Sequence, residues 1–230
     1  MTALPGLRAA SRPLLLPADR LARTVLYLLL LGDVCLVGVS TLLELRLILG
    51  GEVNGRLHNL MRLNNDFGVP ECFNFLKWSI ALLAFGLAWL PGRRLASLCL
   101  LLITALIFAD DIGQIHEAVG ARLAAAVEGP GPLGLRIEDV GELVYWALQG
   151  LVVLALLVAA YRAGDGVERA FVLAFGLAIG GMIVAGAGFD MLHSAVDRPL
   201  WLHRVIAVAE DGGEMVFISL ACVCAIGLAR

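Results

Sequence analysis

The sequence predicts an all-α, polytopic membrane protein with six transmembrane helices, and composition is the first observation behind this prediction. Of the 230 residues, 60% are hydrophobic and only 37 are charged, 17 Lys and Arg plus 20 Asp and Glu. Soluble domains are about 45–50% apolar and about 25% charged. The second observation is that the apolar residues fall in blocks near the length of about 20 residues that crosses a bilayer as a helix. A soluble globular protein is therefore excluded, and no basic run suggests nucleic-acid binding.

Six apolar blocks follow one another along the chain, separated by charged or Pro/Gly-rich breaks such as Gly129-Pro130-Gly131-Pro132. We expect the six spans at residues 22–48, 71–90, 95–124, 137–162, 168–195 and 203–229. Residues 1–20 form an N-terminal leader. Residues 21–91 hold the first two spans with the polar loop 49–70, and residues 92–230 hold the other four. The lipid bilayer is thus the first predicted partner.

An even number of spans places both termini on the same side of the membrane. Basic residues near span ends mark the cytoplasmic side, but there are nine on the side of the termini and eight on the other, with Lys77 counted among the eight. The arginines ahead of the first span favour an orientation with both termini in the cytoplasm: Arg8, Arg12, Arg20 and Arg23.

Ionisable side chains inside the spans gather at one membrane face. Such groups are costly at membrane depth, and they indicate function. The alternating direction of the spans brings the ends of the third and fifth and the starts of the fourth and sixth to the same face. These segments carry the residues from which we expect a site: Asp110, His116, Glu117, Glu138, Glu142, Asp190, His193, Glu210 and Glu214. The opposite face has only three acids, Asp19, Asp165 and Glu168, so the distribution is strongly one-sided.

Helical spacing groups these residues further, because positions three and four apart share a helix face. The stacked pairs are Glu138 with Glu142, Glu210 with Glu214, and Asp190 with His193. On the third span we expect Asp110, Gln114 and Glu117 to form one stripe. Carboxylates stacked in this way repel each other unless they are protonated or bridged by a cation.

An internal repeat relates the third and fourth spans to the fifth and sixth. The pattern E-D-x-G-E-[LM]-V starts at Glu138 and again at Glu210, and the pattern [IL]-H-x-A-V surrounds His116 and again His193. We therefore predict a tandem duplication of a two-helix hairpin, with the two copies forming a four-helix bundle. Two copies of the same sense are related by an axis along the membrane normal.

A four-helix bundle with inward carboxylates and two histidines resembles the carboxylate-bridged di-metal proteins. The resemblance is one of ligand inventory: Asp190-x-x-His193 is nearest to their Glu-x-x-His pattern, and His116 stands beside Glu117. This chain departs from them in having Glu-x-x-x-Glu on the alternate helices. The resemblance implies two divalent metal ions held by the nine site residues above. Iron is the first expectation, with manganese or zinc as alternatives, because oxygen donors and imidazole suit these metals.

The strings Asp110-Asp111 and His116-Glu117, with the later E-D-x-G-E, are also similar to a family of uncharacterised bacterial multi-span membrane proteins with a D-E-x4-H-E signature. This resemblance implies a bacterial-type cell (inner) membrane and carries no function.

The leading functional expectation is a membrane metalloprotein, with a di-iron oxidoreductase acting on a lipid-soluble small molecule as the first enzyme class and a zinc-dependent hydrolase as the second. A proton or cation transporter or pathway is the rival, and a non-catalytic subunit of a membrane complex is the third class. A relay needs acids across the whole bilayer. Here the cluster stops at one face, and Asp33 is the only acid in the middle of the first span.

Overall fold

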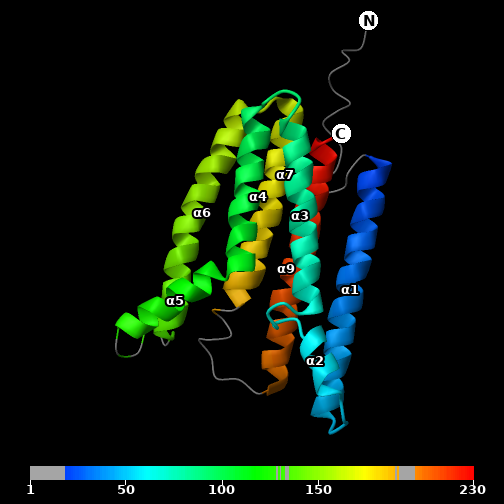
Figure 1. Cartoon of the computed structure of the whole chain (residues 1–230), viewed down its shortest axis with the longest axis vertical. Coiled ribbons are helices and arrows are strands. Elements are labelled where there is room, and N and C mark those ends of the chain that lie inside the picture. The colour runs from blue at the N-terminus through cyan, green and yellow to red at the C-terminus, as the bar shows by residue number, and fades with distance from the viewer. Residues whose placement is uncertain (1–18, 128, 130, 133–134, 190, 192–199) are drawn as a thin grey trace, which may run out of the picture.

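The computed structural model describes residues 19–127, 129, 131–132, 135–189, 191 and 200–230. The predicted all-α fold with six membrane-length helices is confirmed. These helices are α1 (Arg20–Ile48), α3 (Val69–Trp89), α4 (Leu95–Gly113), α6 (Ile137–Ala163), α7 (Gly166–Ile183), which continues into the π-helical turn η2 (Val184–Gly188), and α9 (Leu200–Leu228). Two shorter helices, α2 (Gly55–Met61) and α5 (Ile115–Ala126), lie at the same end of the molecule but on opposite sides of it (Figure 1).

Five of the long helices form a closed ring. In this ring α3 packs against α4, α4 against α6, α6 against α7, α7 against α9, and α9 against α3. Helix α1 lies outside the ring and packs mainly against α9 (Figure 1). The four helices expected to form a bundle are thus all present, and α3 stands between α4 and α9 as a fifth member.

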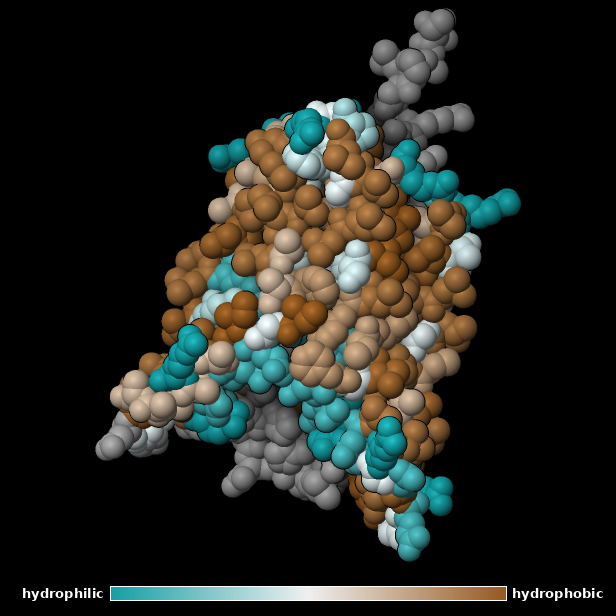
Figure 2. Space-filling view, in the orientation of Figure 1, coloured by the Kyte–Doolittle hydropathy of each residue, from teal (hydrophilic) through white to brown (hydrophobic). Residues whose placement is uncertain are grey.

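The face of the molecule seen in Figure 2 is apolar over most of its height. Large hydrophobic side chains on four different helices are more than half exposed, among them Leu28, Leu83, Leu151 and Leu177. A soluble protein would not expose apolar side chains over so wide a belt, whereas lipid chains solvate them. Inside the ring, Phe85 of α3 and Phe175 of α7 are fully buried and meet edge to face with ring centroids 5.2 Å apart.

A buried ion pair joins α1 to the ring. Lys77 Nζ of α3 lies 2.6 Å from Asp33 Oδ1 of α1, and both side chains are fully buried. Lys77 also donates to Asn74 Oδ1 and to the carbonyl oxygen of Met215, each at 2.9 Å. Ser219 of α9 donates to Asp33 Oδ2 at 2.6 Å. Counting Lys77 with the basic residues outside the membrane was therefore wrong: it lies more than two turns inside α3.

The third span also differs from its prediction as one helix over residues 95–124. Helix α4 ends at Gly113, and Gln114 adopts a left-handed conformation with φ 46° and ψ 43°. Asp110 Oδ1 accepts a hydrogen bond from the backbone N–H of His116 at 3.0 Å and so holds the first turn of α5. The expected stripe of Asp110, Gln114 and Glu117 on one helix face is consequently wrong, because the chain changes direction within it.

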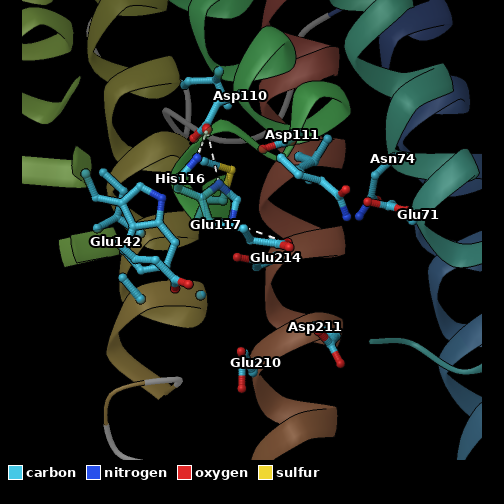
Figure 3. Close-up of a pocket in the computed structure, with 18 of the residues that line it drawn as sticks. Glu71, Asn74, Asp110, Asp111, His116, Glu117, Glu142, Glu210, Asp211 and Glu214 are labelled. Atoms are coloured by element: carbon cyan, nitrogen blue, oxygen red, sulfur yellow. Dashed lines mark hydrogen bonds and ion pairs between the residues drawn. The ribbon is translucent and has the colours of Figure 1, made fainter. Parts of the chain in front are cut away.

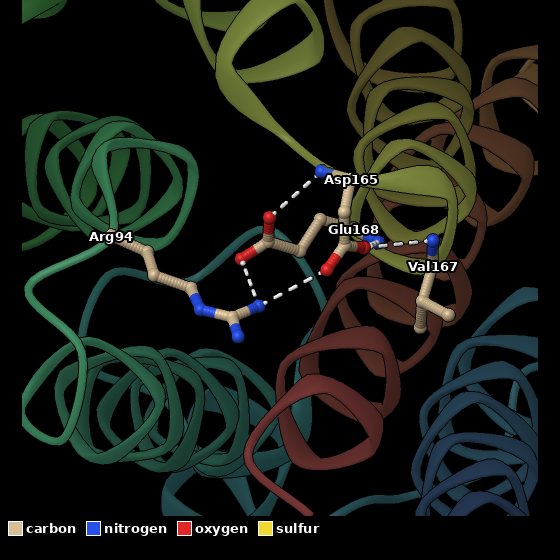
Figure 4. Close-up of polar contacts among 4 residues, drawn as sticks. All are labelled: Arg94, Asp165, Val167 and Glu168. Atoms are coloured by element: carbon tan, nitrogen blue, oxygen red, sulfur yellow. Dashed lines mark hydrogen bonds and ion pairs between the residues drawn. The ribbon is translucent and has the colours of Figure 1, made fainter.

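At the opposite end of the molecule, Arg94 ties two loops together (Figure 4). Its Nη1 lies 3.2 Å from Asp165 Oδ2 and 3.2 Å from Glu168 Oε1. Asp165 and Glu168 also form the capping box that starts α7. Arg230 reaches Asp19, the N-cap of α1, at 2.6 Å at the same end. The described ends of the chain thus lie away from α2 and α5, as six spans require.

Candidate functional site

A cavity of about 500 Å³ opens among the helices of the ring at the end that carries α2 and α5 (Figure 3). Ten carboxylates from the described part of the chain line it: Asp66, Glu71, Asp110, Asp111, Glu117, Glu138, Glu142, Glu210, Asp211 and Glu214. Among the described lining residues, Arg136 is the one permanently positive side chain, and His116 is the one histidine. The cavity is therefore strongly acidic.

Seven of the nine predicted site residues line this one cavity: Asp110, His116, Glu117, Glu138, Glu142, Glu210 and Glu214. They come from α4, α5, α6 and α9, so the expected convergence of helix ends takes place. Asp190 and His193 lie outside the described residues. The cavity is also lined by polar residues that were not among the nine predicted ones: Asp66, Glu71, Asn74, Asp111, Gln149 and Asp211.

His116 is held in place by Asp110. Its Nδ1 lies 3.1 Å from Asp110 Oδ1, the same oxygen that accepts from its backbone N–H. Its Nε2 lies 3.9 Å from Glu117 Oε1, and its ring packs on Trp146 with centroids 5.0 Å apart. In the tautomer that donates Nδ1–H to Asp110, Nε2 carries a free lone pair, which is the arrangement found behind metal-ligating histidines.

The electrostatics of α5 follow from this crowding of acids. Burial by itself lowers the pKa of His116, but the hydrogen bond and charge of Asp110 outweigh burial and, with Glu117 and Glu142, raise the pKa above its ordinary value. Burial also raises the pKa of Glu117, and the charge of Asp66 adds to that effect. Both shifts favour the protonated forms, as expected where negative charge accumulates.

Hydrogen bonds from neighbouring groups hold the carboxylates of Asp111 and Glu71 in place. The fully buried indole of Trp78 donates from Nε1 to Asp111 Oδ2 at 2.8 Å. Glu71, in the first turn of α3, accepts a hydrogen bond from the backbone N–H of Phe67. These contacts anchor the α3 side of the cavity to α4 and to the preceding loop.

Both copies of the E-D-x-G-E motif face the cavity, and in both the motif glycine is a point of close helix approach. A Cβ on Gly141 would lie 2.7 Å from the Cα of Gly120 in α5, and a Cβ on Gly213 would lie 2.8 Å from the Cβ of Ala185 in η2. The aspartates of the motifs differ. Asp139 is fully buried and caps α6 with Arg136, whereas Asp211 lines the cavity.

Glu214 lies against the π-helical turn. A Cβ added to Gly186 would overlap its Oε1 atom, so the missing side chain at this position leaves room for the carboxylate. π-Helical turns are rare and frequently occur at functional sites. The glycine at position 186 therefore sets where the Glu214 carboxylate lies.

The described side chains spread over the cavity wall rather than surround one point. Within the described part of the chain, no group of three or more His, Cys, Asp or Glu side chains is close enough to hold a metal ion. Asp190 and His193, the other two predicted ligands, lie outside the described residues, so the two-metal ligand set stays a prediction.

Residues 67–228 match a family model described as a domain of unknown function, DUF8692. The chain belongs to the DUF8692 family. No curated protein and no solved structure matches the chain. The DUF8692 region begins just before α3 and ends with α9, so it contains the whole five-helix ring and every carboxylate of the cavity except Asp66. Helices α1 and α2 lie outside it.

Proposed function

We propose that this protein is an integral membrane metalloprotein whose acidic cavity binds divalent ions, two of them in a carboxylate- and histidine-ligated centre. The observation that carries the proposal is His116, oriented by Asp110 in the wall of a cavity with nine further carboxylates. Metal-ligating histidines characteristically donate their second ring nitrogen to a carboxylate in this way.

The charge balance of the cavity supports a cation as the ligand. Carboxylates that face one space raise each other's pKa or attract a cation. Among the described lining residues, ten carboxylates with one arginine leave a large negative potential in the cavity. Divalent ions offset that potential more effectively than monovalent ones.

The donor set favours iron, with manganese and zinc as alternatives, because carboxylate oxygen and imidazole nitrogen suit these ions. We propose Glu142, Glu214, His116, Asp190 and His193 as ligands, with Asp110, Glu117, Glu138 and Glu210 as further ligands or supporting partners. An iron pair would supply oxidoreductase chemistry to a lipid-soluble substrate, and zinc would supply hydrolysis.

A proton or cation pathway is the second candidate, and one observation favours it. Asn74 lines the cavity and accepts a hydrogen bond from Lys77. Lys77 also donates to Asp33, and Asp33 accepts a second hydrogen bond from Ser219. Polar contacts thus lead from the cavity into the middle of the helices. Past Ser219, however, the buried neighbours on α9 are Ala221, Cys222 and Val223, so in the described residues the chain of contacts does not continue.

Replacing Gly186 with alanine tests the proposal without altering a ligand. The new methyl group would displace the flexible end of Glu214 while leaving the backbone in place. We expect the affinity for Mn²⁺, measured by titration of the metal-free protein, to fall by about tenfold or more, as for other changes that disturb ligand orientation. Gly180→Ala on the same helix is the matched control, since a Cβ there meets nothing within 4 Å. Equal affinities of the two variants would contradict the placement of Glu214 in the site.

The affinity for Mn²⁺ should also rise as the pH increases above the ordinary histidine pKa of about 6.5. A histidine ligand must be neutral, and the pKa of His116 is raised, so protons compete with the metal until the pH exceeds that raised value. The metal-free protein should lose stability over the same range. A histidine whose pKa is higher in the folded than in the unfolded protein stabilises the fold at pH values below its unfolded pKa. This stabilisation is lost as the pH rises through the folded pKa. Titrations at several pH values check both trends, and a His116→Gln variant with an unchanged pH dependence would refute the role of His116.

A further inference from the structure

The cavity has two chemically different halves. Its mouth holds the carboxylates, but its inner end is lined by Ile107, Val153, Ile179 and Ile218, one residue from each of α4, α6, α7 and α9. Met182 and Met215 lie beside them. Along α6, Val153 is eleven residues beyond Glu142, which corresponds to about 16 Å at 1.5 Å per residue. The acidic region therefore gives way to an apolar region deeper among the spans.

Gln149 stands where the two halves meet. It follows Glu142 by seven residues and so lies on the same face of α6, and it lines the cavity. Its Nε2 atom is buried and has no hydrogen-bond partner among the described residues. A buried amide donor without a partner is unfavourable and rare in native proteins. Such a donor at the wall of a cavity points to a ligand that carries an acceptor.

Gly150 keeps the space next to Gln149 open. It also lines the cavity, and a Cβ added to it would meet no atom within 4 Å. In the middle of a long helix glycine is less favourable than alanine. Here the missing side chain preserves volume on the cavity side of α6.

The volume is that of a site for a small organic molecule. Pockets for such ligands are about 300–1,000 Å³ and are largely apolar with a few placed polar groups. At about 500 Å³ the cavity has far more room than metal ions need, since one water occupies about 30 Å³. The carboxylates at the mouth do not account for the apolar side chains that line the inner end.

We propose that the inner half binds the apolar part of a lipid-soluble molecule, and that a carbonyl or hydroxyl oxygen of this molecule accepts a hydrogen bond from Gln149 Nε2. The oxygen end then faces the carboxylates, and the apolar body lies against Trp146, Met182 and the inner isoleucines. The statement that this molecule is the substrate of the metal centre rests on the proposed function. The binding itself needs no metal, so the two are tested separately.

Benzophenone is a suitable probe, because it is an apolar ketone that becomes photoreactive. On irradiation its carbonyl abstracts a hydrogen atom from a nearby C–H bond, and the two carbon radicals couple to form a new C–C bond, so no other reactant is needed. With metal-free protein in detergent, peptide mass spectrometry should find the adduct on Met182 or Met215. Gly150→Leu, which fills the cavity, should lower this labelling by about tenfold, and Gln149→Leu, which removes the donor, should lower it several-fold.

Gly86→Leu is the matched control, because a Cβ at Gly86 of α3 also meets nothing within 4 Å and Gly86 does not line the cavity. Its labelling should equal that of the unchanged protein. Adducts confined to lipid-facing residues such as Leu151 and Leu154, or equal labelling in Gly150→Leu and Gly86→Leu, would overturn the proposal. A protein that binds Mn²⁺ but fails this test would retain its metal site and lose only the assigned ligand class.

Discussion

Replacing Lys77 with methionine should lower the free energy of unfolding by about 3–5 kcal/mol, the range observed when one partner of a buried ion pair is removed. The Asp33 carboxylate would stay fully buried with Ser219 as its remaining hydrogen-bond donor. The carbonyl oxygen of Met215 and the amide oxygen of Asn74 would lose a donor as well. The effect on stability should therefore be among the largest of any single substitution in the chain.

The double variant Asp33→Leu/Lys77→Met should recover most of that loss, because replacing a whole buried pair with apolar residues is often neutral. Arg94→Met is the control for loss of a positive charge at the opposite end. Its pair with Asp165 is exposed, and exposed ion pairs contribute about 0–1 kcal/mol. Its second partner, Glu168, still accepts a hydrogen bond from the backbone N–H of Asp165. Unfolding in mixed detergent measures all three. If Lys77→Met were no less stable than Arg94→Met, the network of α1, α3 and α9 would not hold these helices together.

The double variant Glu142→Gln/Glu214→Gln should lose at least about 100-fold in affinity for divalent metal. Changes to outer partners of metal ligands already cost 10–100-fold, and this variant changes one proposed ligand on each of α6 and α9. Glutamine is nearly isosteric, so the helices should keep their packing. Glu52→Gln/Asp165→Asn removes the same number of charges outside the cavity and should bind metal normally. Equal affinities of the two double variants would exclude Glu142 and Glu214 as ligands.

Much of the fold follows from hydropathy alone. Lengths and breaks predict six spans, and alternation then brings the carboxylates of α4, α6 and α9 to one end, where they line the cavity. The break between α4 and α5 at Gln114 could not be predicted from hydropathy. No proline marks it, and it depends on Asp110 reaching the backbone of His116 across the turn.

The pairing of Asp33 with Lys77 was beyond the sequence for another reason. Asp33 was visible as an acid inside the first span, whereas Lys77 was counted among the basic residues near a membrane face. Their contact depends on how α1, α3 and α9 are arranged. Gln149 could not be predicted as a site residue either, because the burial of its amide and the lack of a hydrogen-bond partner are seen only in the folded structure. Local patterns thus predict helices and their polar ends, whereas contacts between helices need the folded structure.

The central claim, that the acidic cavity holds metal, is tested most directly by elemental analysis of the purified protein. Protein prepared without added metal should contain about two iron, manganese or zinc ions per chain, the content expected of a two-metal centre. Glu142→Gln/Glu214→Gln, purified in parallel, should contain almost none while still inserting into the membrane. Protein without stoichiometric metal, or equal metal in the two preparations, would contradict the claim and favour the proton or cation pathway.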